Sequence, residues 1–100
     1  MNRFRIIEEL IEKATGRIVN GEAVWEELER AVGQYEGEDG RVTVTGRDDL
    51  YERWDYYIDL HRNYDEEYDE WEINIRLLEI SILNRKTHKT NYIEIQGATL

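Results

Sequence analysis

Apolar side chains follow a helical spacing in the first 35 residues. Within residues 2–14 they recur at intervals of three and four, which places them on one face of a helix that Thr15 and Gly16 should end. A second helix should begin near Asn20, a suitable N-cap residue. The residues expected on the buried faces are Phe4, Ile7, Leu10, Ile11 and Ala14, then Val24, Trp25, Leu28, Ala31, Val32 and Tyr35.

After a glycine-rich loop at 33–40 the period changes to two, which predicts strands. A short strand is expected at 41–45, a hairpin turn at 46–49, and long strands at 50–60 and about 69–83. A polar turn at 84–89 then leads into a last strand. In the first long strand Leu50, Trp54, Tyr56, Ile58 and Leu60 should face the helices, and in the second Trp71, Ile73, Ile75 and Leu77 share a face. The last strand contains Tyr92, Ile93 and Ile95.

The alternation in the second long strand changes phase at Leu77 and Leu78. Because a slip of one residue turns every later side chain to the other face, this change predicts a β-bulge near Leu77. Two helices followed by four strands, without interleaved helices, predict an α+β fold. We expect a single domain over residues 1–100, with both helices on one face of an antiparallel β-meander.

Composition narrows the possible partners. The chain has 100 residues, no cysteine and a formal net charge of −10. Such a charge repels nucleic-acid phosphates and anionic lipid, so the expected partner is a basic protein surface, and neither nucleic acid nor a membrane. No apolar run approaches the roughly 20 residues that span a bilayer, and we expect a cytoplasmic protein.

Residues 64–72 are the most unusual segment, with six carboxylates, three aromatic side chains and no cation. The candidate partner-binding residues are Tyr64, Asp65, Glu66, Glu67, Tyr68, Asp69, Glu70, Trp71 and Glu72. Carboxylates two apart on a strand lie about 6.6–6.8 Å apart, a separation of the same order as that of neighbouring phosphates. One interpretation is therefore a mimic of nucleic acid. The other is a solvated hairpin tip whose acids prevent pairing between molecules.

Other chemistry has weaker support. Asp65, Glu67 and Asp69 have the spacing of a calcium loop, but Glu70 stands where that loop needs glycine and Arg76 where it needs glutamate. His61 and His88 have no partner at a ligand or triad spacing, and Ser81 lacks a nucleophile motif. Three carboxylates on the outer face of the sheet could serve an enzyme, namely Asp55, Asp59 and Glu72. A chain this short offers them little cleft, so we expect no enzyme, no metal and no cofactor.

Self-association is the main alternative function. The outer face of the sheet should display Tyr51, Tyr57, Leu83 and Tyr92 among charges. A homodimer through that face or through an edge strand is one interpretation, and isolated exposed aromatic residues are the other. In the first case the protein is a structural homo-oligomer whose acids serve solubility.

In residues 64–82, Asp and Glu alternate with Tyr, Trp and Ile along long strands. In this composition the chain resembles small accessory proteins of archaeal viruses and phages, among which are anti-CRISPR inhibitors. The resemblance implies an inhibitor that works inside a host cell. The resulting hypothesis is a non-enzymatic binding protein whose acidic hairpin engages the nucleic-acid groove of a host complex.

Overall fold

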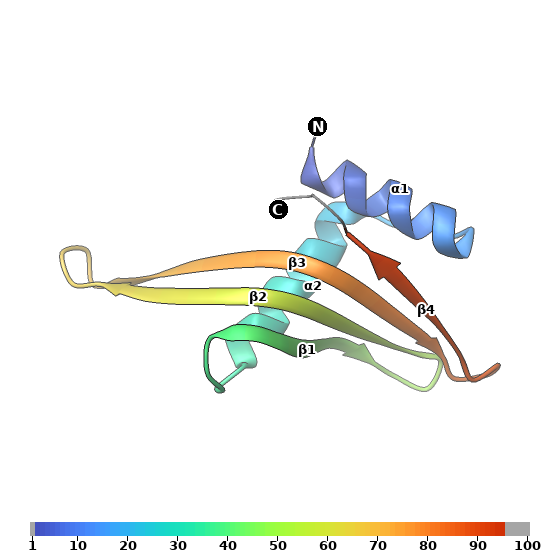
Figure 1. Cartoon of the computed structure of the whole chain (residues 1–100). Coiled ribbons are helices and arrows are strands. Elements are labelled where there is room, and N and C mark those ends of the chain that lie inside the picture. Colours follow the sequence, from blue (N-terminus) through green and yellow to red (C-terminus); the bar gives the residue numbers. More distant parts are fainter. Residues whose placement is uncertain (1, 96–100) are drawn as a thin grey trace.

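The computed structural model describes residues 2–95, in which two helices precede a four-stranded sheet (Figure 1). The elements are α1 (Arg3–Thr15), α2 (Gly21–Gln34), β1 (Gly40–Asp48), β2 (Glu52–Asp65), β3 (Glu70–Asn84) and β4 (Lys89–Glu94). The strands are antiparallel in the order β1-β2-β3-β4. The predicted α+β meander is thus confirmed.

Side chains and one glycine fix the ends of the helices. The Asn2 side chain accepts a hydrogen bond from Phe4 N–H at 2.8 Å, and that of Asn20 accepts one from Ala23 N–H at 3.1 Å. These bonds satisfy amides that a helix leaves without partners at its start. Gly16 ends α1 with φ 75°, a left-handed conformation that glycine adopts without strain. The predicted helix boundaries are confirmed, but Ala14 is exposed rather than buried.

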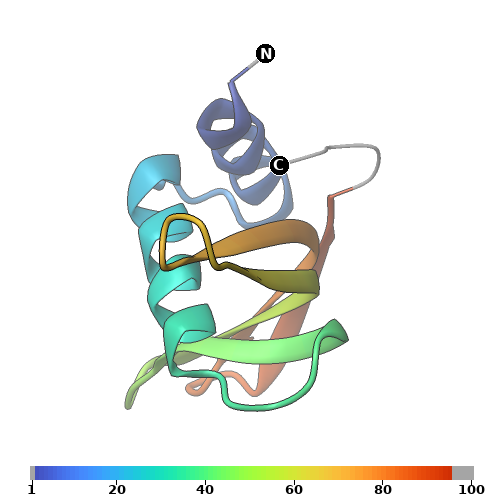
Figure 2. The ribbon, with the colours of Figure 1, turned by 90° about the vertical axis from the view of Figure 1, so that its left-hand side faces the viewer.

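The core lies between the two helices and one face of the sheet, as the end-on view in Figure 2 shows. Ile7 and Ile11 of α1 and Leu28 of α2 are fully buried against it. The sheet contributes fully buried side chains from its two central strands, β2 and β3. These are Trp54, Tyr56, Ile58, Leu60, Leu77 and Ile80.

The sheet contains two bulges. The pairing of β2 with β3 shifts between Tyr57 and Ile58, so that Leu78 is the additional residue. This confirms the bulge predicted near Leu77. A second bulge at Gly46 in β1 was not predicted, because glycine in this position was interpreted as part of a hairpin turn.

The turn between β1 and β2 lies later than predicted, after Asp48. The side chain of Asp49 accepts hydrogen bonds from the N–H groups of Tyr51 and Glu52, both at 2.8 Å. Such an Asx turn competes with strand pairing. Leu50 and Tyr51 therefore lie in the turn and are 88% and 78% exposed, so the prediction that Leu50 faces the helices is wrong.

The hairpin of β2 and β3 extends beyond the rest of the sheet. β1 stops pairing with β2 at Leu60, and β4 pairs with β3 only from Glu79 to Asn84. We call residues 61–74, the projecting part, the arm. It is the long hairpin at the left of Figure 1, and it makes the molecule 49 Å long in its largest dimension. No helix within residues 2–95 is long and apolar enough to cross a membrane.

Candidate functional site on the acidic arm

The arm has two faces of different chemistry. Tyr64 lies opposite Trp71, and Arg62 lies opposite Ile73, on the face that carries core residues nearer the helices. Asp65 and Glu70 form the last cross-strand pair and lie on the other face, where Glu72 follows. One face is thus mostly apolar and the other acidic.

The apolar face carries exposed aromatic side chains. The rings of Tyr64 and Trp71 are in contact, with centroids 5.4 Å apart and planes at 56°. Tyr64 is 45% exposed, Trp71 63% and Ile73 48%. The helices do not reach this far along the hairpin. The apolar side chains on this face of the arm therefore have no second layer packed over them.

The tip of the arm is a turn at 66–69. Asp65 Oδ1 accepts a hydrogen bond from Glu67 N–H at 3.0 Å, which shapes the turn. Asp69 has φ 51°, in the left-handed region that Asp and Asn tolerate better than most residues. Tyr68 also lies on the tip and is 67% exposed. The segment therefore uses one of its carboxylates for local structure and leaves the others in solvent.

The negative charge of the arm is not neutralised within the described structure. Five of its six carboxylate residues are exposed, and Asp65 is half-buried. Arg62 is the only arginine or lysine of the arm, and it is already engaged. Its guanidinium donates to Asp39 Oδ1 at 2.7 Å and to the carbonyl oxygens of Tyr35 and Gly37. The tip therefore presents carboxylates with no cation beside them.

Asp39 attaches the loop after α2 to the base of the arm. Its second oxygen accepts a hydrogen bond from Arg62 N–H at 2.8 Å. The backbone amide and guanidinium of Arg62 hold the pKa of Asp39 below its ordinary value. This loop covers the β2 edge of the arm at Arg62. The Asp39–Arg62 contact was not predicted, because the sequence gives no sign that residues 23 positions apart meet.

A hollow of about 570 Å³ lies where the arm meets the end of α2. Trp71 and Ile73 line it from the arm, and Val32 and Tyr35 from the helix end. The combination of an apolar wall with the exposed carboxylates beyond it is typical of a protein-binding surface.

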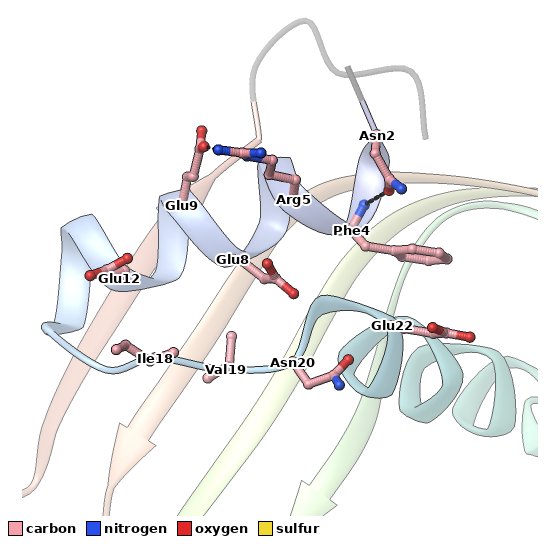
Figure 3. Close-up of a pocket in the computed structure, with 10 residues that line it drawn as sticks. All are labelled: Asn2, Phe4, Arg5, Glu8, Glu9, Glu12, Ile18, Val19, Asn20 and Glu22. Carbon is pink, nitrogen blue, oxygen red and sulfur yellow. Dashed lines mark hydrogen bonds and ion pairs between the residues drawn. The ribbon is translucent and has the colours of Figure 1, made fainter.

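A second hollow, about 680 Å³, lies elsewhere, between α1 and the connection to α2 (Figure 3). Glutamates line much of it, and two of them already have partners. Glu8 accepts a hydrogen bond from Gly21 N–H at 2.8 Å, and Glu9 pairs with Arg5 on the same helix. We find no convergent group of functional side chains in this open groove.

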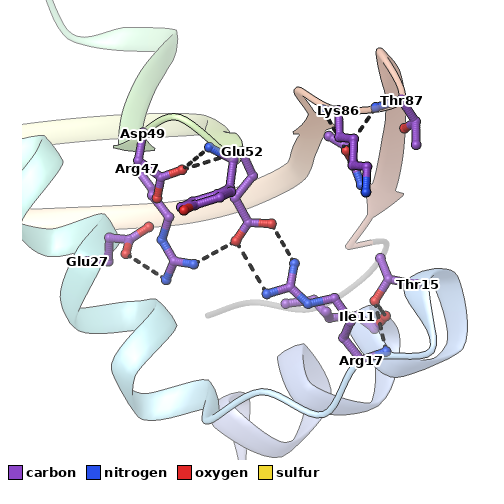
Figure 4. Close-up of polar contacts among 11 residues, drawn as sticks. Ile11, Thr15, Arg17, Glu27, Arg47, Asp49, Glu52, Lys86 and Thr87 are labelled. Atoms are coloured by element: carbon purple, nitrogen blue, oxygen red, sulfur yellow. Dashed lines mark hydrogen bonds and ion pairs between the residues drawn. The ribbon is translucent and has the colours of Figure 1, made fainter.

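A charged network joins the helices to the first hairpin (Figure 4). Arg17 and Arg47 both bind Glu52, at 2.6 Å and 2.8 Å, and Arg47 also contacts Glu27 at 3.3 Å. Burial raises the pKa of Glu52. Hydrogen bonds, led by the one from Arg17, and the positive charge of Arg17 outweigh this effect and leave the pKa below its ordinary value. Each charge in this network is paired, so we infer that the network stabilises the fold.

The carboxylates considered for catalysis do not converge. Along the outer face, Asp55 lies opposite Ser81, Asp59 opposite Arg76 and Glu72 opposite Asn63. Neighbours in this row are four residue positions apart, about 13 Å. Within residues 2–95 no three His, Cys, Asp or Glu side chains are arranged to hold a metal ion.

The outer face is less apolar than predicted. Tyr57 and Leu83 lie on it but are half-buried, and Tyr92 is 69% exposed. Tyr51 lies in the first turn and not on this face. Among the predicted partner-binding residues, by contrast, Tyr64 contacts Trp71 and Asp65 pairs with Glu70, so the structure brings these residues together.

Comparison with known proteins identifies no relative. No protein-family model, no curated protein and no solved structure matches the chain. Any function must therefore be argued from the residues themselves.

Proposed function

We propose that the protein is a non-enzymatic inhibitor that binds a basic, nucleic-acid-binding surface through the arm, in the cytoplasm of a host cell and in the manner of viral accessory proteins. The arm would occupy the groove in place of nucleic acid. The carboxylates supply the charge, and the aromatic side chains add apolar contact.

The observation that carries the proposal is the isolation of negative charge at the end of the arm. Asp65, Glu66, Glu67, Asp69, Glu70 and Glu72 lie within eight residues, and the one nearby guanidinium is held by Asp39. A concentration of one sign of charge accelerates association with an oppositely charged groove.

The spacing of the acids supports contact with phosphate-binding residues. Glu70 and Glu72 project from the same face of β3, about 6.6–6.8 Å apart. Asp65 lies beside Glu70 on the neighbouring strand. Lysines and arginines arranged for successive phosphates could therefore bind successive carboxylates.

The apolar face supports affinity beyond charge alone. Tyr64, Tyr68 and Trp71 are rigid, exposed aromatic side chains, and such residues are frequent among those that dominate binding energy. Their position beside the acids would let a partner cover both kinds of surface.

The test compares two variants that lose the same charge. The tip variant carries Asp65→Asn, Glu66→Gln, Glu67→Gln and Asp69→Asn. Asn at 65 retains the acceptor for Glu67 N–H, and Asn at 69 tolerates the left-handed backbone. The control variant carries Glu12→Gln, Glu26→Gln, Glu36→Gln and Glu38→Gln, all exposed residues outside the arm.

Proteins that elute from immobilised nucleic acid would be passed over each immobilised variant. The native chain and the control should retain a basic protein that added duplex DNA or RNA displaces, whereas the tip variant should not. Equal retention by the tip variant would show that the arm is not the binding site. If none of the three retains a protein that nucleic acid displaces, mimicry is wrong.

A further inference from the structure

The two edges of the arm differ. The β2 edge meets the loop that contains Asp39, which accepts a hydrogen bond from Arg62 N–H. Within residues 2–95, no strand pairs with the outer edge of β3 from Glu70 to Leu77, because β4 begins its pairing at Glu79. A free edge with unpaired backbone groups is a template for another strand.

We propose that two copies of the chain associate through this edge, with their β3 strands antiparallel and Ile73 opposite Ile73 of the second copy. The sheet would then continue across both copies. This inference concerns self-association. It shares Glu70, Trp71 and Glu72 with the proposed function, but the tip at 65–69 lies outside the paired segment, so the tip variant does not remove the proposed contacts between copies.

Symmetry restricts how the two strands can pair. In an antiparallel pair, two opposite residues either exchange hydrogen bonds with each other or both point their backbone groups away. These two kinds of position alternate along each strand. Two identical strands can therefore pair only if odd-numbered residues lie opposite odd-numbered residues. Trp71, Ile73 and Ile75 then meet only one another, on the apolar face.

Charge complementarity is satisfied in this register. With Ile73 opposite itself, Glu70 lies opposite Arg76 of the second copy, and Trp71 lies opposite Ile75. By symmetry each contact occurs twice. Both Glu70 and Arg76 are exposed, and neither has an ion pair with another residue in 2–95. Cross-strand pairs of opposite charge, and of aromatic with β-branched residues, stabilise sheets.

The neighbouring registers are unfavourable. A shift in one direction centres the pair on Glu72, which then faces its own carboxylate. A shift in the other direction also pairs opposite charges, Glu72 with Arg76. It places Glu70 opposite Leu78, however, whose carbonyl already accepts a hydrogen bond from Ile95 N–H at 2.9 Å. Within residues 2–95, the end of β4 therefore sets the limit of the free edge.

A groove of about 470 Å³ beside this edge would receive the aromatic side chain of the second copy. Ile73 and Ile75 line it from β3, and Arg3 and Trp25 line it from the helices. Trp71, which is 63% exposed, would lie opposite Ile75 of the other copy and so at this groove.

The charge contact can be tested by reversal. Sedimentation equilibrium over a dilution series should show a dimer for the native chain. Glu70→Arg alone and Arg76→Glu alone should each raise the dimer dissociation constant about tenfold, because each creates two like-charge contacts. An equimolar mixture of the two single variants should dimerise like the native chain, since each contact then joins opposite charges.

The register can be tested independently by cross-linking, because the chain contains no cysteine. Opposite residues have Cα atoms about 4.5–5.5 Å apart, within the range that a disulfide bridges. Ile73→Cys should oxidise to a covalent dimer, whereas Ile75→Cys should not, since its two copies would be about 13 Å apart. A monomeric native chain, unchanged association of both single charge variants, or equal cross-linking at 73 and 75 would each overturn the proposal.

Discussion

The hydroxyl of Tyr56 donates a hydrogen bond to Glu27 Oε1 at 3.1 Å and so joins the buried centre of β2 to α2. Burial, together with the negative charge of Glu27, raises the pKa of Tyr56, so the hydroxyl stays protonated and can donate. Tyr56→Phe should lower the free energy of unfolding by about 1–2 kcal/mol. Urea denaturation measures this. Tyr57→Phe is the control on the opposite face, and an equal loss there would contradict the assigned role.

Gly46 is required by close packing at the first bulge. A Cβ atom on this residue would overlap the ring of Tyr56 and lie 2.9 Å from Glu27 Oε1. Gly46→Ala should therefore cost about 1–3 kcal/mol of stability. Gly33→Ala is a matched control in α2, where a Cβ meets nothing within 4 Å, and it should stabilise the protein by roughly 0.5–1 kcal/mol. Thermal unfolding of both variants checks the contrast, which equal shifts would contradict.

Glu52 should make stability depend on acid pH. Its pKa is lower in the folded chain than in the unfolded chain, where a value of about 4.3 is expected. Its contribution is therefore present above that pH and is lost as pH falls through the folded pKa. Urea unfolding should show Glu52→Gln less stable than the native chain at pH 7, with the difference shrinking toward pH 3. Glu9→Gln, which removes a solvent-exposed pair with Arg5, should change little at either pH.

Arg62 should hold the loop after α2 in place. Its guanidinium donates to Asp39 and two carbonyl groups and also lies over the ring of Tyr35. Arg62→Ala therefore removes three hydrogen bonds and this ring contact, and it retains the backbone bond to Asp39. Amide hydrogen exchange at residues 36–40 should become faster, while exchange in β4 stays as in the native chain. Unchanged exchange in the loop would show that the loop is held by other contacts.

Much of this architecture was predictable because the period of the apolar pattern reports directly on helices and strands. The phase change at Leu77 and Leu78 predicted a bulge that the structure confirms. Gly46 and Leu50 were wrongly assigned because glycine is common in turns as well as in bulges, and because the Asx turn of Asp49 removes Leu50 from the strand.

The candidate site was predictable only as a segment. The sequence identified the carboxylates and aromatic side chains of residues 64–72, but it could not show that the hairpin extends past the helices. The length of one layer relative to another depends on tertiary packing, so the exposure of Ile73 was not predictable. Among the described residues, the free edge of β3 likewise follows from the difference in length between β3 and β4.

The salt dependence of partner binding is the sharpest measure of whether the acidic arm binds the partner. The affinity of the retained partner would be measured between low and physiological salt for the native chain, the tip variant and the control variant. We expect a steep loss of affinity with salt for the native chain and the control variant. For the tip variant we expect a lower affinity that depends less on salt. Superimposable salt curves for all three proteins would contradict the role of the acidic arm.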